Sequence, residues 1–173
     1  MAKLFDESSQ CCGCSACQEI CPTAAVELRE GEDGEGFLYP VIRKERCIDC
    51  GLCEKVCDFK NPSSGATPLE VCAVQHRSES VRGASTSGGV FTALSDEILK
   101  SGGVVFGAAL NESVEVLHTW AEDAAGRDRM RASQSVQSRP DQVSRSGRDF
   151  LRQGTTLLFT VAPCLIAVFP CHR

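Results

Sequence analysis

The second half of the chain carries short apolar runs separated by polar stretches, a pattern that predicts strands alternating with helices. Residues 104–110 are apolar almost without interruption, which is typical of a strand buried on both faces. Residues 155–161 repeat this pattern, residues 71–74 form a shorter apolar strand, and residues 114–120 alternate between apolar and polar positions. The pattern predicts a sheet covered by helices on both faces.

Two helices are predicted between these strands. Ser87-Gly88-Gly89 opens the first, which places Val90, Phe91, Leu94 and Ile98 on one face before Gly102-Gly103 closes it. The second is a polar helix over residues 142–152.

The first 60 residues are organised differently. Residues 23–28 predict a helical turn that runs into a strand, residues 31–36 a turn, and residues 37–39 a returning strand that Pro40 ends. A unit of about 55 residues has little room for an apolar core. Residues 61–70 are rich in Pro, Ser and Gly and form a linker by composition. The predicted organisation is a domain over residues 1–60, this linker, and an α/β domain over residues 71–173.

Twelve cysteines change this picture, because eight of them follow one spacing rule twice. Residues 11–21 and residues 47–57 both read C-x-x-C-x-x-C-x-x-x-C. Three thiolates at this spacing wrap one face of an iron–sulfur cube, while the fourth points toward a neighbouring cube. The spacing therefore predicts two 4Fe-4S clusters ligated crosswise. One would be held by Cys11, Cys14, Cys17 and Cys57, and the other by Cys47, Cys50, Cys53 and Cys21.

Other uses of the cysteines fit the spacing less well. Structural zinc needs two pairs of ligands and has no use for a third cysteine two residues later. A disulfide framework needs an oxidising compartment, but residues 1–7 are polar and acidic where a signal peptide would be apolar. No apolar run is long enough to span a membrane. We expect a cytoplasmic protein in a reducing, anaerobic setting.

Cys12 and Cys72 do not fit the ligand spacing, so we expect them to be spare buried thiols. The apolar side chains expected to shield the clusters are Ile20, Val26, Ile48, Leu52, Val56 and Phe59.

Charge is concentrated in the cysteine-rich part. Residues 1–60 hold 7 Lys and Arg against 12 Asp and Glu, a net charge of −5, whereas the remainder is neutral. Cluster thiolates add negative charge, so this part should repel nucleic acid and favour a redox partner with a basic surface. The alternative is that the acidic residues only keep a small domain soluble.

The order of these motifs resembles one known family. A two-cluster ferredoxin unit, then Ser85-Thr86-Ser87-Gly88-Gly89-Val90-Phe91, then residues 102–108 (GGVVFGA), is similar to the coenzyme F-420 hydrogenase/dehydrogenase beta-subunit family. The resemblance implies an α+β ferredoxin-like domain with a pseudo-twofold repeat, followed by a partial α/β domain. It also implies electron transfer between iron–sulfur clusters, a bound flavin such as FAD and, in some members, coenzyme F-420.

The resemblance weakens after about residue 120. The family's Ser-Lys-Tyr-x-Gln-Ser stretch reads Ser-Gln-Ser-Val-Gln-Ser at residues 133–138, and its Gly-Thr-Pro-Cys-Gln reads Val-Ala-Pro-Cys-Leu at residues 161–165. The chain then stops at Arg173, where the family continues through a flavin-binding domain. We expect a truncated or frame-shifted amino-terminal portion of a longer enzyme, which would hold flavin weakly.

Several residues outside the cluster motifs have two interpretations. Ser87, Gly88 and Gly89 could hold a flavin phosphate at a helix N-terminus, or they could form an ordinary helix cap. Cys164 follows a predicted strand, where α/β sheets bind ligands, and Cys171 has no predicted role. The arginines of residues 127–152 could meet a phosphate or form a solvated helix face. His118 and Trp120 are most simply strand residues.

The function predicted from these observations is an electron-transfer module of a flavin-dependent oxidoreductase, working with a redox partner protein or a flavin-bearing domain. The alternative is a stand-alone ferredoxin-type carrier whose second half is not catalytic. Retention of flavin would separate the two.

Overall fold

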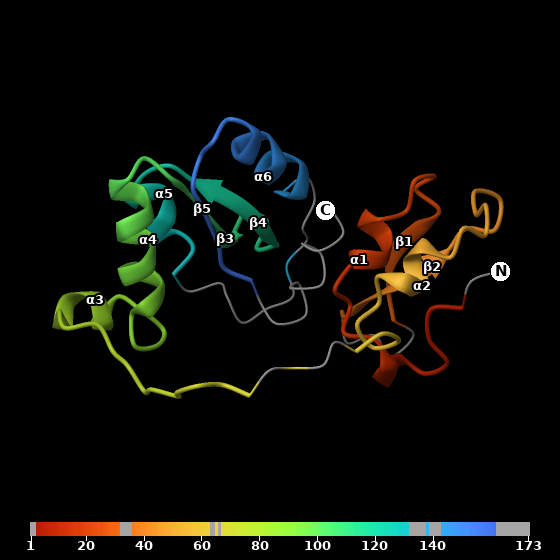
Figure 1. Ribbon diagram of the computed structural model, residues 1–173, viewed down its shortest axis with the longest axis horizontal. Helices are drawn as coiled ribbons and strands as arrows, with labels where there is room; N and C mark the ends of the chain where they lie inside the picture. The colour runs from red at the N-terminus through yellow and green to blue at the C-terminus, as the bar shows by residue number, and fades with distance from the viewer. Residues whose placement is uncertain are drawn as a thin grey trace. The chain divides into compact units, whose positions relative to one another are not determined.

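A computed structural model describes residues 3–31, 36–62, 65, 67–131, 138 and 143–161. The described residues divide into two compact units, which lie within residues 1–66 and 67–162. Both units combine helices with small sheets, so the fold is mixed α/β (Figure 1). No helix in the described part of the chain has the length and apolar character needed to cross a membrane.

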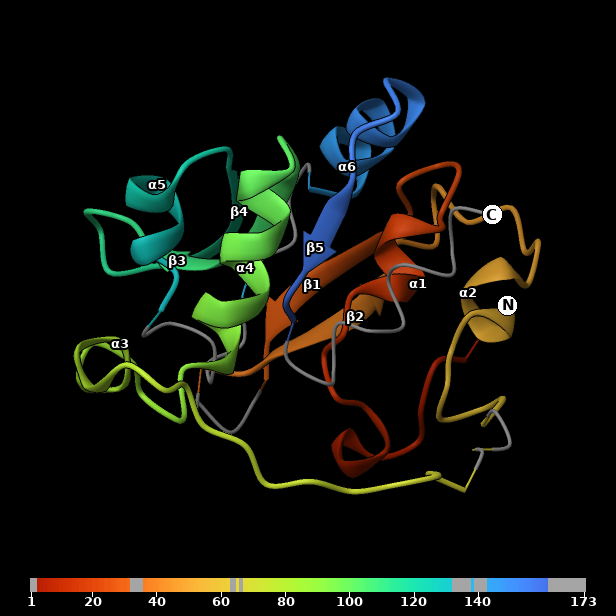
Figure 2. The ribbon, with the colours of Figure 1, turned by 60° about the vertical axis from the view of Figure 1, so that its left-hand side comes forward.

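The first unit is built on one antiparallel ribbon. Strand β1 (Val26–Glu30) pairs with β2 (Leu38–Ile42), in a register that runs from Val26 opposite Ile42 to Glu30 opposite Leu38. The 3-10 helix η1 (Ser8–Gln10) and two single-turn helices, α1 (Ala16–Glu19) and α2 (Leu52–Lys55), complete the unit. Figure 2 shows α1 lying beside the ribbon.

Pro40 does not end the second strand as predicted. It lies at the centre of β2, buried and opposite Leu28. Proline lacks the N–H that a central strand needs, but each strand of a two-stranded sheet has one open edge that tolerates it. The prediction failed because proline ends a strand only where its missing N–H is needed for pairing.

The second unit is a three-stranded sheet with helices on both faces. Its strands are β3 (Val104–Leu110), β4 (Val116–Ala121) and β5 (Leu157–Phe159), in the order β4-β3-β5. Strand β4 is antiparallel to β3, and β5 is parallel to it. The helices are α3 (Glu79–Gly83), α4 (Val90–Lys100), α5 (Ala124–Asp128) and α6 (Val143–Arg152).

Alternate residues of β3 supply two cores. Val104 and Phe106 pack with Val143, Phe150 and Phe159, which places α6 on that face. Val105 packs on the opposite face with Met130 and with Phe91, Ile98 and Leu99 of α4. Figure 1 shows α4 and α6 on the two sides of the sheet. The prediction of a strand covered on both faces is confirmed for residues 104–108, whereas Leu110 is 54% exposed.

Residues 71–74 do not form the predicted strand. They pair with no strand among the described residues, and Val71 is 84% exposed. Just after this segment, the backbone is hydrogen-bonded to the residues that precede α4: His76 N donates to Gly88 O at 2.6 Å. An apolar run of four residues is too short for its pattern to specify a pairing partner.

Candidate metal centre

The two cysteine runs adopt the same local backbone. Gly13 (φ 63°) and Asp49 (φ 55°) occupy equivalent positions, as do Ser15 (φ 63°) and Gly51 (φ 70°), and all four are left-handed. A one-turn helix follows each pair, α1 after Ser15 and α2 after Gly51. Left-handed residues turn the chain sharply, so the repeated conformation curls each run into a tight loop.

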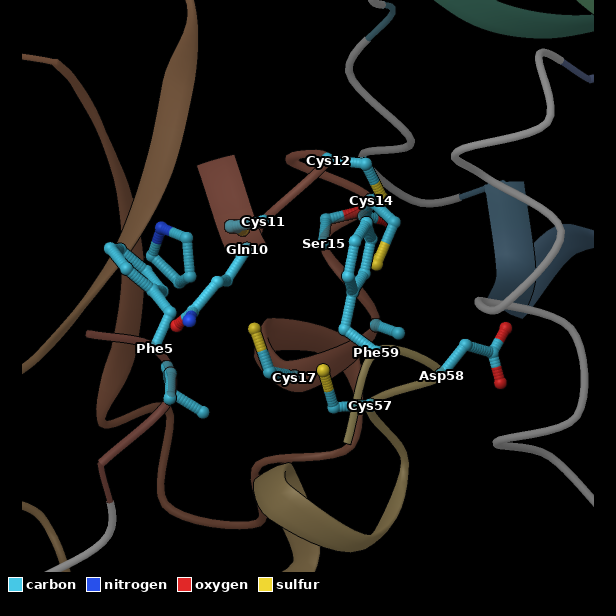
Figure 3. Close-up of a pocket in the computed structure, with 13 residues that line it drawn as sticks. Phe5, Gln10, Cys11, Cys12, Cys14, Ser15, Cys17, Cys57, Asp58 and Phe59 are labelled. Atoms are coloured by element: carbon cyan, nitrogen blue, oxygen red, sulfur yellow. The ribbon is translucent and has the colours of Figure 1, made fainter. Parts of the chain in front are cut away.

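The first loop and the end of the second meet around a hollow of about 290 Å³. Four of the predicted ligands line it: Cys11, Cys14 and Cys17 from the first run, and Cys57 from the second. Figure 3 shows the sulfur atoms of Cys17 and Cys57 pointing into the same open space. Most other lining residues are apolar, among them Leu4, Phe5, Ala16, Pro40 and Phe59.

The remaining four predicted ligands line a second hollow. Cys47, Cys50 and Cys53 come from the second run, and Cys21 comes from the end of the first. Its volume of about 20 Å³ is close to the room that one water molecule needs, roughly 10–15 Å³. Cys50 is exposed, whereas Cys17 of the first hollow is buried. A cluster held by this second set would therefore lie at the surface.

In both hollows the fourth thiol comes from the other cysteine run. The structure thus brings together the same two sets of four that the crossed spacing predicts, while ligation of iron by these sets stays a prediction. Among the described residues, no three His, Cys, Asp or Glu side chains converge on a point where they could hold a single metal ion. Thiols spread around a hollow suit a polynuclear cluster better than one zinc ion.

Burial controls the acidity of the thiols in the first hollow. Burial raises the pKa of Cys14 and the pKa of Cys17 to about 12, and it also raises the pKa of Cys11. Such thiols are neutral at pH 7 unless a cation takes the place of the proton. Because the ligands of a metal must be deprotonated, cluster assembly here must release protons.

Backbone amides reach sulfur in both hollows. Gly13 N donates to Cys11 Sγ at 3.4 Å, and Ala25 N donates to Cys21 Sγ at 3.2 Å. Burial would raise the pKa of Cys21, but the hydrogen bonds from Ala25 and Thr23 outweigh it and lower that pKa. Amides directed at sulfur stabilise negative charge and are one means of setting a cluster's reduction potential.

The apolar residues expected to shield the clusters do so unequally. Val26 is 3% exposed, as predicted, but Ile48 is 63% and Phe59 56% exposed even though both line the hollows. Ile20 and Val56 are half-buried, and Leu52, also expected to shield the clusters, is exposed. The described side chains of this small unit therefore leave part of each lining exposed.

Three other expectations need correction. Cys72 is exposed rather than buried, and its thiol donates to Glu70 Oε1 at 3.1 Å. Cys12 is half-buried rather than buried, and it lines the first hollow. Arg127 lies on no solvated face: it is 3% exposed and bonds Asp96 and Ser95 of α4. The cysteine pair at residues 11–12 was the one signal in the sequence that could have drawn attention to Cys12.

Packing and backbone conformation explain the two glycines of the predicted phosphate site. A Cβ added to Gly88 would lie 2.9 Å from Val74 O. Gly89 is left-handed, with φ +79°, and a Cβ added to it would lie 3.0 Å from His76 Cβ. Ser87 is exposed, and Gly89 is the N-cap of α4. Cys164, Cys171 and residues 133–137 lie outside the described residues.

Comparison with known proteins identifies the first unit. Residues 10–61 match the 4Fe-4S dicluster domain family. Two uncharacterized ferredoxins of Methanocaldococcus jannaschii are similar to this chain: one is 41% identical over 46 residues and the other 36% identical over 50 residues. The matches cover 27% and 29% of this chain. The chain spans 26% of the length of each relative. The N-terminal part of this chain is therefore a ferredoxin-type 4Fe-4S domain.

Proposed function

We propose that the first unit is a one-electron carrier that binds two 4Fe-4S clusters with crossed ligation. Cys11, Cys14, Cys17 and Cys57 hold the first cluster. Cys47, Cys50, Cys53 and Cys21 hold the second. The clusters supply the redox chemistry, and the protein binds them, limits their contact with water and directs amides at their sulfurs.

One observation carries this proposal: eight cysteines of a 4Fe-4S dicluster domain sort into two sets of four around two hollows, with one member of each set exchanged between the runs. A relay needs at least one cluster close to solvent, because electrons pass to partners at the surface. The exposed side chains of Cys50 and Ile48 give the second set that position.

The metal content tests the proposal directly. Anaerobically reconstituted protein should contain about eight iron and eight sulfide per chain, with a visible absorbance band that bleaches on reduction. Iron and sulfide analysis with EPR of the reduced protein gives the count. Stoichiometric zinc without sulfide would contradict the proposal.

The wider context we propose is a flavin-dependent oxidoreductase similar to the coenzyme F-420 hydrogenase/dehydrogenase beta-subunit family. The motif order supports it, together with a sheet that carries helices on both faces and follows the dicluster domain. The redox partner would then be a flavin-bearing domain or protein, met in the cytoplasm through the acidic first unit.

The alternative is a carrier without catalysis, and flavin binding separates the two. FAD titrated into the cluster-loaded protein should be retained through gel filtration if the second unit contributes to a flavin site. Loss of all FAD, with clusters intact, would favour the stand-alone carrier.

A further inference from the structure

The first hollow contains more thiols than one cluster can use. Five cysteines line it: Cys11, Cys12, Cys14, Cys17 and Cys57. A 4Fe-4S cube offers four iron corners to the protein, so one thiol is surplus. Figure 3 shows Cys12 at the edge of the hollow next to Cys14. The second hollow is lined by four cysteines, so the two sites differ in this respect.

Cys12 is the surplus thiol by spacing, yet it is placed like a ligand. It is half-buried, and it lines the hollow together with Cys14. It precedes Gly13, a left-handed residue at φ 63° whose missing Cβ lets this part of the loop change conformation at low cost. Cys11, on the other side of Cys12, is also only half-buried.

The second run provides a natural comparison. The residue equivalent to Cys12 is Ile48, which lines the second hollow in the same way but has no atom that can bind iron. The backbones of the two loops match at the following left-handed residues, Gly13 and Asp49. The two loops therefore differ at this position in ligating ability rather than in shape.

We propose that Cys12 is a reserve ligand of the first cluster, able to take the iron that Cys11 holds. In the exchange, the bond from iron to Cys11 Sγ breaks, the bond from iron to Cys12 Sγ forms, and the proton leaving Cys12 is taken up by Cys11. No electron is transferred, so no oxidant is required. The inference rests on the proposed function, because it presupposes a cluster in the first hollow.

Iron content of anaerobically reconstituted full-length variants tests this. Alanine is the replacement of choice because serine oxygen can itself bind iron. Cys11→Ala and Cys12→Ala should each keep about eight iron per chain, whereas the double variant should fall to about four. Cys47→Ala is the matched control: with isoleucine at the neighbouring position, it should fall to about four.

Alkylation of the folded, cluster-loaded protein provides a second measurement that does not depend on the double variant. Peptide mass spectrometry should find Cys12 modified in the wild type and protected in Cys11→Ala, since its thiol is then bound to iron. Cys72, which is exposed, should be modified in both.

The outcomes separate this inference from the function it rests on. A loss of half the iron in Cys11→Ala, equal to that in Cys47→Ala, would overturn the reserve role while leaving the two clusters in place. Loss in Cys12→Ala but not in Cys11→Ala would also overturn it, since Cys12 would then be the principal ligand. Wild-type protein without 4Fe-4S clusters would instead refute the proposed function, and this inference with it.

Discussion

At the residue scale, a cysteine's position in its run decides which hollow it lines. Cys57 and Cys21 lie in runs that each hold three other predicted ligands, but each lines the hollow of the opposite run. A side chain three residues beyond a tight loop projects away from it, so its partner set is determined by the neighbouring loop.

Replacing Cys57 should therefore damage the cluster of the first run. Cys57→Ala protein should retain the same residual EPR spectrum as Cys17→Ala, and a different one from Cys53→Ala, because Cys57 shares its hollow with Cys17. Iron analysis should show about half the wild-type content in all three variants. A Cys57→Ala spectrum that matches Cys53→Ala would show that ligation is not crossed.

His118 is a buried residue whose charge state affects the second unit. It is 6% exposed, its Nδ1 accepts from Ser138 Oγ at 2.8 Å, and its Nε2 donates to Thr160 O at 3.1 Å. Burial lowers the pKa of His118, and the bond to Thr160 offsets part of that effect. The folded protein therefore favours the neutral ring.

Stability of the second unit should fall as the pH drops. The unfolded chain binds a proton on His118 near pH 6.5, whereas the folded chain resists doing so. The contribution is full above that pH and is lost as the pH falls toward the folded pKa. Urea unfolding followed by fluorescence of Trp120, the one tryptophan, should show this loss as the pH falls below about 6.5. His118→Gln should reduce the pH dependence.

At the scale of elements, two kinds of contact hold helices of the second unit in place. Helices α4 and α6 pack against β3, and a buried arginine links α5 to α4. Arg127 of α5 donates to Ser95 Oγ at 2.6 Å and to Asp96 Oδ1 at 2.8 Å, both on α4, and also to Asp128 of its own helix. These bonds join two helices that cover the same face of the sheet.

Removing this cation should destabilise the second unit. Arg127→Met should lower the free energy of unfolding by about 2–4 kcal/mol, because it leaves the α4 acceptors without their donor. Urea unfolding followed by Trp120 fluorescence measures the loss. Arg152→Met, which removes an exposed arginine paired with Asp149 at 3.5 Å, should cause no measurable change. Equal effects in the two variants would contradict a special role for Arg127.

At the scale of the whole molecule, the two units differ in what stabilises them. The buried apolar residues of the first are few and mostly small, namely Ala16, Cys17, Ala25 and Val26. The second buries Val104, Val105, Phe106 and Met130. A metal that binds only the folded state contributes its binding free energy to folding.

Removing iron should therefore unfold the first unit and leave the second folded. Hydrogen–deuterium exchange with mass spectrometry, before and after treatment with a chelator and a reductant, should show loss of protection in residues 10–61. Protection in residues 90–131 should persist. Simultaneous loss in both segments would show that the units depend on each other for stability.

The sequence alone determined the cysteine spacing, and with it the domain type and the sets of thiols that share a hollow. It also predicted β3 and its burial on both faces, because a long continuous apolar run favours a strand covered on both sides. These features depend on neighbours along the chain or on a repeated motif, which a sequence displays directly.

Tertiary structure decided what depends on neighbours distant in sequence. It placed Pro40 inside a strand with an open edge, left residues 71–74 unpaired, buried Arg127 against α4 and put Cys12 in the first hollow. In each case the residue type permits two environments, and the free energy of packing and hydrogen bonding with distant residues selects one of them. No local pattern contains that information.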